Sequence, residues 1–268
     1  MAEIVLTPKG DIDIMVEAEV ITPDAFANKK PAELEQLIVW QGPRELPLSE
    51  FFDVEGSGSS AQDTTIIIED DVPRVKRIGA GMSAGRIVVE GSAGMHVGSE
   101  MLGGDILVKG DAGSWAGMEM KGGMLHILGN ASDHVGCAYR GSWHGMTGGR
   151  ILIEGSARSQ LGGGMSGGEI VVNKSVENFC AIRQSAGSIV VRGDAVRGVG
   201  AEMTGGTVVV CGHVFQPLPG FEYGGTESDL KLGDTECLGE FLKFAGDYAV
   251  SARAKGTLYV ASELNRGL

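Results

Sequence analysis

The sequence lacks both a long apolar run and an excess of positive charge. No eighteen consecutive apolar residues occur among its 268, and no secretory signal is recognisable at its start, so neither a membrane-spanning helix nor export is expected. Lysine and arginine total 22 against 35 aspartate and glutamate, a net charge of −13. Proteins that bind nucleic acid present basic surfaces. The composition therefore predicts a soluble, cytoplasmic protein with no membrane or nucleic-acid partner.

Cysteine is scarce, and its spacing excludes the common cysteine-based sites. The four cysteines are Cys137, Cys180, Cys211 and Cys237, and no Cys-x-x-Cys pair occurs. A disulfide framework, a zinc ribbon and an iron–sulfur site each require a different pattern of cysteines. We therefore predict four plain thiols, which behave as small apolar side chains where they are buried.

Glycine is abundant, at 44 of 268 residues, more than double its usual share of about 7%. It lies mainly within residues 79–212, where a pattern of nineteen residues returns seven times. The pattern, which has lapses, is Gly-x-x-Met, Gly-Gly, an apolar triplet, one variable residue and glycine, with Lys174 in place of one final glycine. A seven-residue insertion near 139–145 causes the single long interval. The residues at the methionine position are Met82, Met101, Met120, Met146, Met165, Gln184 and Met203.

A fixed period near twenty is typical of solenoid proteins. The triplets are rich in β-branched residues, are bounded by glycine and form no apolar face at 3.6-residue spacing, so they indicate strands. The leucines and asparagine ladder of a leucine-rich repeat are missing. We predict an all-β fold, a parallel β-helix of about seven coils spanning roughly 34 Å. The triplets begin at Ile87, Ile106, Leu125, Ile151, Ile170, Ile189 and Val208.

One outward position of the repeat is unexpectedly apolar. It is the middle residue of each triplet, between two residues that point inward, so the two-residue period of a strand turns it outward. A continuous apolar stripe on the outside of a solenoid must be covered, either by the ends of the chain or by another subunit. As interface candidates we therefore name Val88, Leu107, His126, Leu152, Val171, Val190 and Val209.

The two ends of the chain lie outside the repeat. Residues 1–63 are predicted as an N-terminal cap, residues 64–212 as the β-helix and residues 213–268 as a C-terminal cap. In the first cap we expect strands at 4–6, 11–21 and 38–40 and a short helix from Pro31, because proline is favoured at the first helical position. In the second we expect short strands at 230–232, 240–244, 248–251 and 258–262, which cap the last coil or fold back over the stripe.

Few residues in the sequence suggest a catalytic, cofactor-binding or metal site. Residues 162–167 match a dinucleotide fingerprint, but a strand and not a helix is predicted after them. His96 and His134 share one repeat position two coils apart, roughly 9.6 Å, which is too far for one metal ion, so we predict a stacked column with Trp115 between them. No catalytic or metal-ligating constellation is found.

The insertion and the interrupted stripe are more informative. Solenoids often place binding loops where the repeat is interrupted, and aromatic residues with arginine are typical anchors of interfaces. Tyr139, Arg140, Trp143 and His144 are therefore candidates for contact with a partner or ligand. His126 is predicted to make a polar contact with whatever covers the stripe.

Residues 79–91, 113–123 and 139–149 closely resemble the C subunit of formylmethanofuran dehydrogenase, and the segments 4–9 and 254–260 fit as well. The resemblance extends to the bacterial formyltransferase/hydrolase complex and, more distantly, to the C-terminal domain of the glutamate synthase large subunit. It implies a right-handed β-helix that acts as a non-catalytic scaffold. The complex moves formyl groups between tetrahydromethanopterin and a methanofuran-type coenzyme and hydrolyses the formyl-furan to formate.

The resemblance also implies partners and cofactors. The partners are an amidohydrolase-like subunit, a formyltransferase subunit and a further subunit; the coenzyme belongs to the complex, zinc to another subunit, and this chain binds no cofactor alone. Overall likeness favours the bacterial hydrolytic complex, with an archaeal CO₂-reducing dehydrogenase, a glutamate-synthase-like structural domain and an independent enzyme acting on carbohydrate as alternatives. Because a chain of this charge repels a polyglutamate arm, any contact with the arm needs local basic residues, for which the candidates are Arg140, Arg150, Arg183, Arg192 and Arg197.

Overall fold

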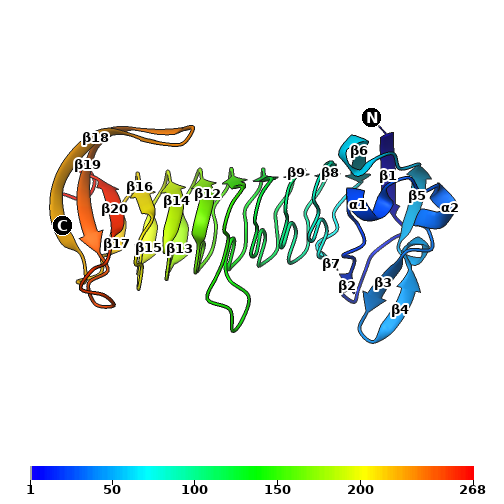
Figure 1. Ribbon diagram of the computed structural model, residues 1–268, viewed down its shortest axis with the longest axis horizontal. Coiled ribbons are helices and arrows are strands. Elements are labelled where there is room, and N and C mark those ends of the chain that lie inside the picture. The colour runs from blue at the N-terminus through cyan, green and yellow to red at the C-terminus, as the bar shows by residue number, and fades with distance from the viewer. Residues whose placement is uncertain (1) are drawn as a thin grey trace.

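The structure, a computed structural model that describes residues 2–268, consists mostly of strands, with two short helices and two single 3-10 turns. Figure 1 shows the repeats as narrow units that stand side by side along the long axis, between the N-terminal and C-terminal segments. The predicted all-β class is confirmed. Within the described residues, no helix combines the length and the apolar character that crossing a bilayer requires.

Every predicted triplet lies in a strand, and each of these strands pairs in parallel with that of the next repeat. The register is constant, so that Ile87 lies beside Ile106 and Ile106 beside Leu125. The insertion does not disturb it, since Leu125 still lies beside Ile151. These strands are β8 (Arg86–Val89), β9 (Asp105–Val108), β10 (Met124–Ile127), β11 (Arg150–Ile153), β12 (Ser166–Val172), β14 (Ala186–Val191) and β16 (Thr207–Val210).

Two columns of aliphatic side chains form the centre of the core. The first residues of the triplets are at most 1% exposed, and burial of each contributes about 1.5–3 kcal/mol. The residues two positions later are completely buried, and they are Val89, Val108, Ile127, Ile153, Val172, Val191 and Val210. The predicted small column is buried too, at Ala93, Ala112, Ala131, Ala157, Val176 and Ala195.

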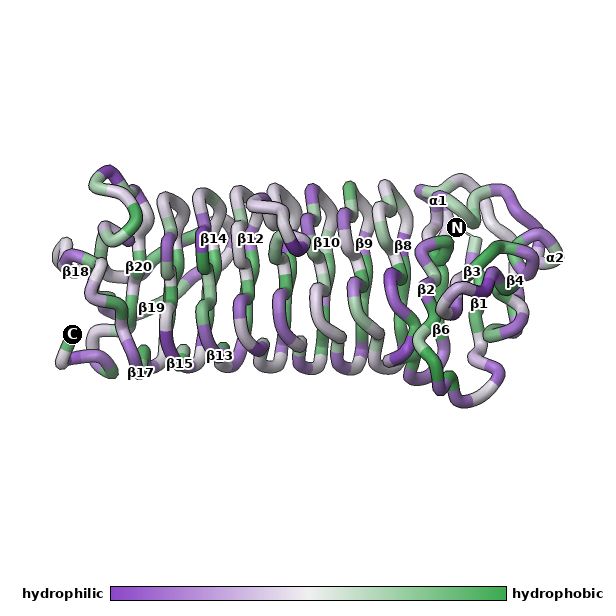
Figure 2. Tube along the Cα trace, turned by 90° about the horizontal axis from the view of Figure 1, so that it is seen from below, coloured by the Kyte–Doolittle hydropathy of each residue, from purple (hydrophilic) through white to green (hydrophobic). Residues whose placement is uncertain are grey.

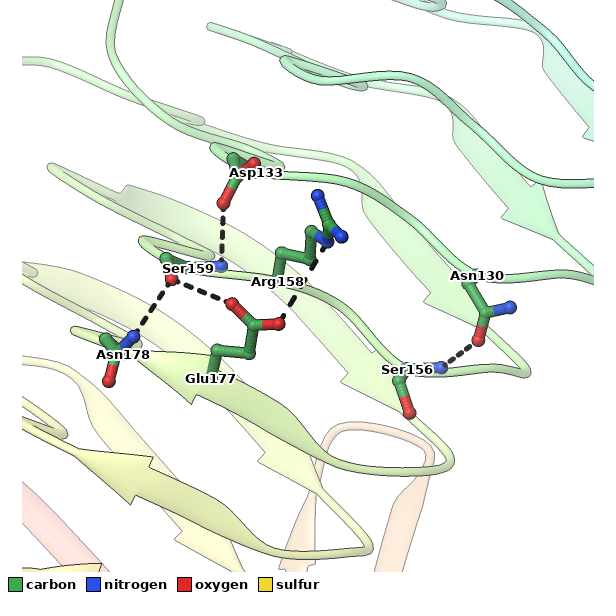
Figure 3. Close-up of polar contacts among 7 residues, drawn as sticks. All are labelled: Asn130, Asp133, Ser156, Arg158, Ser159, Glu177 and Asn178. Atoms are coloured by element: carbon green, nitrogen blue, oxygen red, sulfur yellow. Dashed lines mark hydrogen bonds and ion pairs between the residues drawn. The ribbon is translucent and has the colours of Figure 1, made fainter.

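A second line of strands follows this small column. It consists of β13 (Val176–Asn178), β15 (Ala195–Arg197) and β17 (Val214–Gln216), and single parallel bridges continue it toward the N-terminus. Beside it, polar side chains accept hydrogen bonds from the backbone of the next unit: Asn130 Oδ1 from the Ser156 N–H at 3.0 Å and Asp133 Oδ1 from the Ser159 N–H at 3.1 Å (Figure 3). These bonds tie neighbouring units together on the surface.

The corners of the repeat are of two kinds. At Gly123 φ is +79°, and a Cβ atom would lie 2.5 Å from the carbonyl oxygen of Gly104 in the preceding unit, so only glycine fits. At a second corner φ is also positive, yet the residues are His96, Trp115 and His134, with φ of 61–65°. Glycine therefore marks the corners where two backbones meet closely, and large side chains occupy corners that open outward.

The N-terminal segment extends the main sheet. β6 (Thr64–Ile68) pairs in parallel with β8, β1 (Ala2–Pro8) pairs in parallel with β6, and β5 (Phe52–Gly56) forms the edge. The expected strands at 4–6 and 38–40 and the helix from Pro31 are present, but most of 11–21 is irregular, so that prediction is wrong outside two residues. The remaining elements are β2 (Val16–Glu17), α1 (Pro23–Phe26), α2 (Pro31–Leu34), β3 (Ile38–Gln41), β4 (Arg44–Pro47), η1 (Leu48–Glu50), η2 (Ala61–Asp63) and β7 (Val75–Lys76).

The C-terminal segment adds one more parallel strand and a long hairpin. β20 (Gly256–Ala261) pairs in parallel with β16, so the parallel pairing continues past the predicted limit at residue 212. β18 (Glu222–Leu232) and β19 (Thr235–Gly246) form the hairpin, and β19 pairs antiparallel with β20. The strand expected at 248–251 is wrong, because residues 248–250 form a turn.

Candidate interaction surfaces

The apolar stripe has a half that the chain itself covers. Val171, Val190 and Val209 are at most 3% exposed and cluster with Leu230 and Phe241 of the hairpin. Figure 1 shows this hairpin running back from the C-terminal end above β16 and β14. Of the two predicted kinds of cover, the end of the chain therefore applies here. The prediction of these three valines as contacts of another subunit is corrected.

The tip of the hairpin is fixed by polar contacts. Arg150 donates to the Thr235 hydroxyl at 3.3 Å and pairs with the Glu169 carboxylate at 3.3 Å, and Thr235 donates to Glu169 at 2.6 Å. Arg192 donates to the backbone oxygen of Glu236 at 3.4 Å. Both arginines thus help to attach the hairpin, and their contact with a coenzyme arm stays a prediction.

The other half of the stripe has no such cover. The hairpin cluster ends at Leu152, while Leu107 and His126 are half-buried and Val88 is 9% exposed. His126 Nε2 lies 2.8 Å from Glu154 Oε1, and this hydrogen bond is the main cause that lowers the pKa of Glu154. The polar contact predicted between His126 and a covering element is thus made within the chain. Leu107 and its neighbours remain accessible.

The seven-residue insertion forms a loop away from the hairpin. It projects below the stacked units in Figure 1, and Figure 2 shows it lying over them between β10 and β12. Its base is closed where the Met146 N–H donates to the Gly136 oxygen at 2.9 Å. Trp143 is 67% and Tyr139 51% exposed. The loop therefore presents large aromatic side chains that the rest of the chain does not bury.

Two arginines stack on tryptophans around this loop. Arg140 Cζ lies 5.4 Å from the ring centroid of Trp115, and Arg183 Cζ lies 4.8 Å from that of Trp143. Arg197, by contrast, stacks over Phe179 at 5.3 Å. The predicted arginines are thus divided, two at the hairpin, two at the loop and one over Phe179. His144, the remaining candidate in the insertion, is exposed.

The predicted column of stacked rings is present. The ring centroids of His96 and Trp115 are 5.4 Å apart and those of Trp115 and His134 are 4.7 Å apart, with interplanar angles of 8° and 15°. Burial lowers the pKa of His96 to about 4, and the neighbouring Arg77 and Lys76 add to this shift. Burial also lowers the pKa of His134. Burial therefore favours the neutral form of both imidazoles.

The lowered pKa values predict that acid weakens the fold. The folded-state pKa of His96 lies below its unfolded value of about 6.5, so between these two values the unfolded chain binds more protons. Stability is full above about pH 6.5 and falls as the pH drops toward 4. The variant H96N/H134N lacks both imidazoles, and asparagine tolerates the positive φ at these positions. Urea unfolding at pH 7.5 and 5.5 should therefore show a smaller loss of stability on acidification for the variant than for the wild-type chain. An equal loss in both proteins would contradict this assignment.

The cysteines are free thiols, as predicted. Burial raises the pKa of Cys137 and of Cys180 to about 12, so neither is reactive near neutral pH. Cys237 of the hairpin packs in the same cluster as Cys211, and contact between the two thiols raises the pKa of Cys211. No pattern in the sequence predicts this contact between two free thiols, because Cys237 lies outside the repeat and has no fixed repeat position.

The other candidate motifs lead to no chemical site. Residues 162–167 are followed by β12 and not by a helix, so the dinucleotide interpretation is excluded as predicted. Across residues 2–268, no three His, Cys, Asp or Glu side chains come together in a group able to hold a metal ion. On the face drawn in Figure 3, Ser159, Glu177, Asn178 and Arg158 bond to one another. The polar groups of these side chains therefore find their partners on the same face of the chain.

Comparison with known proteins places these features in one family. No protein-family model matches the sequence. The chain is 74% identical over 266 residues to the C subunit of the molybdenum-containing formylmethanofuran dehydrogenase 1 of Methanosarcina barkeri, a match that covers 99% of this chain and 88% of that protein. Over 98 residues, 36% of each chain, it is 44% identical to the C subunit of the tungsten-containing formylmethanofuran dehydrogenase 2 of Methanothermobacter thermautotrophicus.

A solved structure gives an independent comparison. The chain is similar to one in the crystal structure of the formyltransferase/hydrolase complex from Methylorubrum extorquens in complex with methylofuran. The TM-score is 0.83 at 30% identity, covering 96% of this chain and 99% of that chain. Both full-length matches include the non-repetitive ends, so they do not arise from glycine-rich repeats alone. The chain belongs to the family of formylmethanofuran dehydrogenase C subunits.

Proposed function

We propose that this chain is the non-catalytic scaffold subunit of a complex that transfers formyl groups. In this proposal residues 64–212 form a right-handed parallel β-helix, with residues 1–63 and 213–268 as its caps. The observation that carries the proposal is the 74% identity to a formylmethanofuran dehydrogenase C subunit over 99% of the chain. The constant register of the parallel strands supports the architecture.

The partners follow from the same proposal. The chain contacts an amidohydrolase-like subunit, a formyltransferase subunit or their counterparts, and a further subunit of the complex. The complex uses a methanofuran-type coenzyme, which this chain does not bind alone, and zinc belongs to another subunit. Of the two kinds of complex, we propose the dehydrogenase kind, because identity is 74% to the Methanosarcina barkeri protein and 30% to the chain of the bacterial formyltransferase/hydrolase complex.

We propose the open half of the stripe as one contact surface. Half-buried Leu107 lies in it, between Val88, which is 9% exposed, and His126, and the 41% exposed Leu128 directly follows β10. Leu152 borders the part that the hairpin covers. The open half continues the face that the hairpin already covers at Val171. Apolar area of this kind is typical of permanent subunit interfaces. A neighbouring subunit that continues the cover of the hairpin would complete the burial of the stripe.

Leu107→Asp tests this surface. A carboxylate in the centre of a buried contact costs several kcal/mol, so the variant chain is expected to fold but to lose its partners when the complex is purified by a tag on this chain. Val196→Asp is the matched control, since Val196 is 41% exposed on a different face. The subunits are counted by native mass spectrometry. Full retention of partners by Leu107→Asp would rule out the open half as an interface.

Contact with the coenzyme's polyglutamate arm remains a separate proposal. Arg150 and Arg192 also attach the hairpin, so substitutions there would disturb the fold as well, and the test uses Arg140, Arg183 and Arg197. Reversal of charge at these three positions, tested by the amount of coenzyme retained in the purified complex, decides the question. An unchanged amount of retained coenzyme would show that the polyglutamate arm does not bind these three arginines.

A further inference from the structure

A pocket of about 220 Å³ lies between the insertion loop and the stacked units. It is lined by Trp115 and His134 of the ring column, by Arg183, and by Tyr139, Arg140 and Trp143 of the loop. Two guanidinium groups thus meet aromatic surfaces in one small concave site. This is the composition of a site for a carboxylate that is carried on a partly apolar chain.

Both arginines lie within cation–π distance of a tryptophan ring. Arg140 and Arg183 lie over indole rings at 5.4 and 4.8 Å. A guanidinium whose face is against a ring keeps its N–H groups at its edge, where they bind a carboxylate through two parallel hydrogen bonds. A carboxylate that binds at the edge of either guanidinium is therefore compatible with its contact to tryptophan.

Of the two arginines at the pocket, Arg183 has an ion-pair partner within the chain and Arg140 has none among the described residues. Within residues 2–268, Arg140 has no carboxylate within ion-pair distance, while Arg183 pairs with Glu202 at 2.8 Å on the exposed surface. The nearby Glu119 accepts the Tyr139 N–H at 2.9 Å, and His134 is neutral because burial lowers its pKa. A free cation thus faces solvent on a chain whose net charge is −13, which is the charge complement of an acidic segment.

The exposed aromatics point to a protein as the occupant. Trp143 is 67% and Tyr139 51% exposed, and tryptophan, tyrosine and arginine are the residues that dominate the energetics of protein interfaces. The loop is closed at its base by the bond between Met146 and Gly136. It is therefore an addition to the repeat whose side chains do not serve the core.

We infer that this pocket is the docking site for an acidic segment of another protein subunit. A carboxylate of that segment binds between Arg140 and Arg183, and an apolar group next to it packs on Trp143. The inference rests on the proposed function for the nature of the partner, a subunit of the same complex. The pocket and the open half of the stripe lie on different faces, so the scaffold contacts its partners in at least two places.

The test replaces Trp143 with the photo-cross-linking amino acid p-benzoylphenylalanine in the assembled complex. After irradiation and digestion, mass spectrometry is expected to identify a peptide of another subunit that contains Asp or Glu. Adding Arg140→Glu and Arg183→Glu should lower the cross-link yield about tenfold or more, since two charge-assisted pairs are lost. Arg158→Glu is the control, because Arg158 is also exposed but lies on the face drawn in Figure 3.

A charge-swapped pair keeps the test independent of folding. Replacing the cross-linked acidic residue of the partner by lysine should restore the yield with Arg140→Glu. The inference is overturned by a cross-link to the coenzyme, to a peptide without Asp or Glu, or only to this chain, or by a yield that the double charge reversal leaves unchanged. If other subunits still co-purify in those cases, only the pocket assignment fails; if none co-purifies with the wild-type chain, the proposed function fails.

Discussion

Gly123→Ala is expected to destabilise the fold by about 2–5 kcal/mol, which combines the cost of overpacking with that of a left-handed backbone. The new Cβ would lie 2.5 Å from the Gly104 oxygen and 2.8 Å from the Gly103 carbonyl carbon, at a φ of +79°. Both are backbone atoms of the preceding unit, so neither moves without shifting the parallel register. Urea unfolding followed by circular dichroism measures the loss.

Gly81→Ala separates the steric cost from the backbone cost. Its φ is +65°, but no atom lies within 4 Å of the added Cβ. Glu100 and Glu119 occupy the same repeat position at φ of 58° and 52°, so a side chain is accommodated there. We expect a loss of about 1–2 kcal/mol. Equal losses in the two variants would mean that close approach between units does not explain the glycine column.

Phe241→Ala is expected to cost about 3–5 kcal/mol, as for other large buried aromatics. Phe241 is 2% exposed and packs in the cluster that covers Val171, Val190 and Val209. Because the hairpin lies at one end of the stack, the loss should appear first as local opening. Hydrogen exchange should show faster exchange in β18 and β19 while β9 and β10 keep their protection.

Phe215→Ala provides the matched control for the hairpin. Phe215 lies on β17 and is 62% exposed, and its ring centroid lies 5.7 Å from that of His213. Its removal should change stability by about 0.5 kcal/mol or less. If both phenylalanine variants leave hairpin exchange unchanged, the hairpin is not held by its apolar face, and the polar contacts of Arg150 must hold it instead.

The strands and the core were predictable because each depends on a short period. Ile87, Ile106 and Leu125 recur every nineteen residues, and their equal spacing sets both strand position and parallel register. The cover over Val190 was not predictable in detail, since Leu230 and Phe241 lie in a segment without a repeat. Sequence alone therefore named the chain's end and another subunit as alternatives, and the structure divides the stripe between a covered and an open half.

The candidate arginines illustrate the same limit. Their charge was evident from sequence, but Arg150 and Arg192 are engaged by Thr235 and Glu236, which lie more than forty residues away. The contact of Arg140 with Trp115 likewise joins the insertion to a different unit. Long-range contacts of non-repetitive segments decide which side chains remain free, and the repeat carries no information about them.

The central claim is that this subunit acts as a scaffold by binding other subunits at its surface. Hydroxyl-radical footprinting of side chains, in the isolated chain and in the purified complex, tests it most directly. We expect Leu107, Tyr139 and Trp143 to be oxidised in the isolated chain and protected in the complex. Phe241 should be protected in both, because the hairpin buries it in either state. Equal oxidation of Leu107 and Trp143 in the isolated chain and in the complex would contradict the scaffold account.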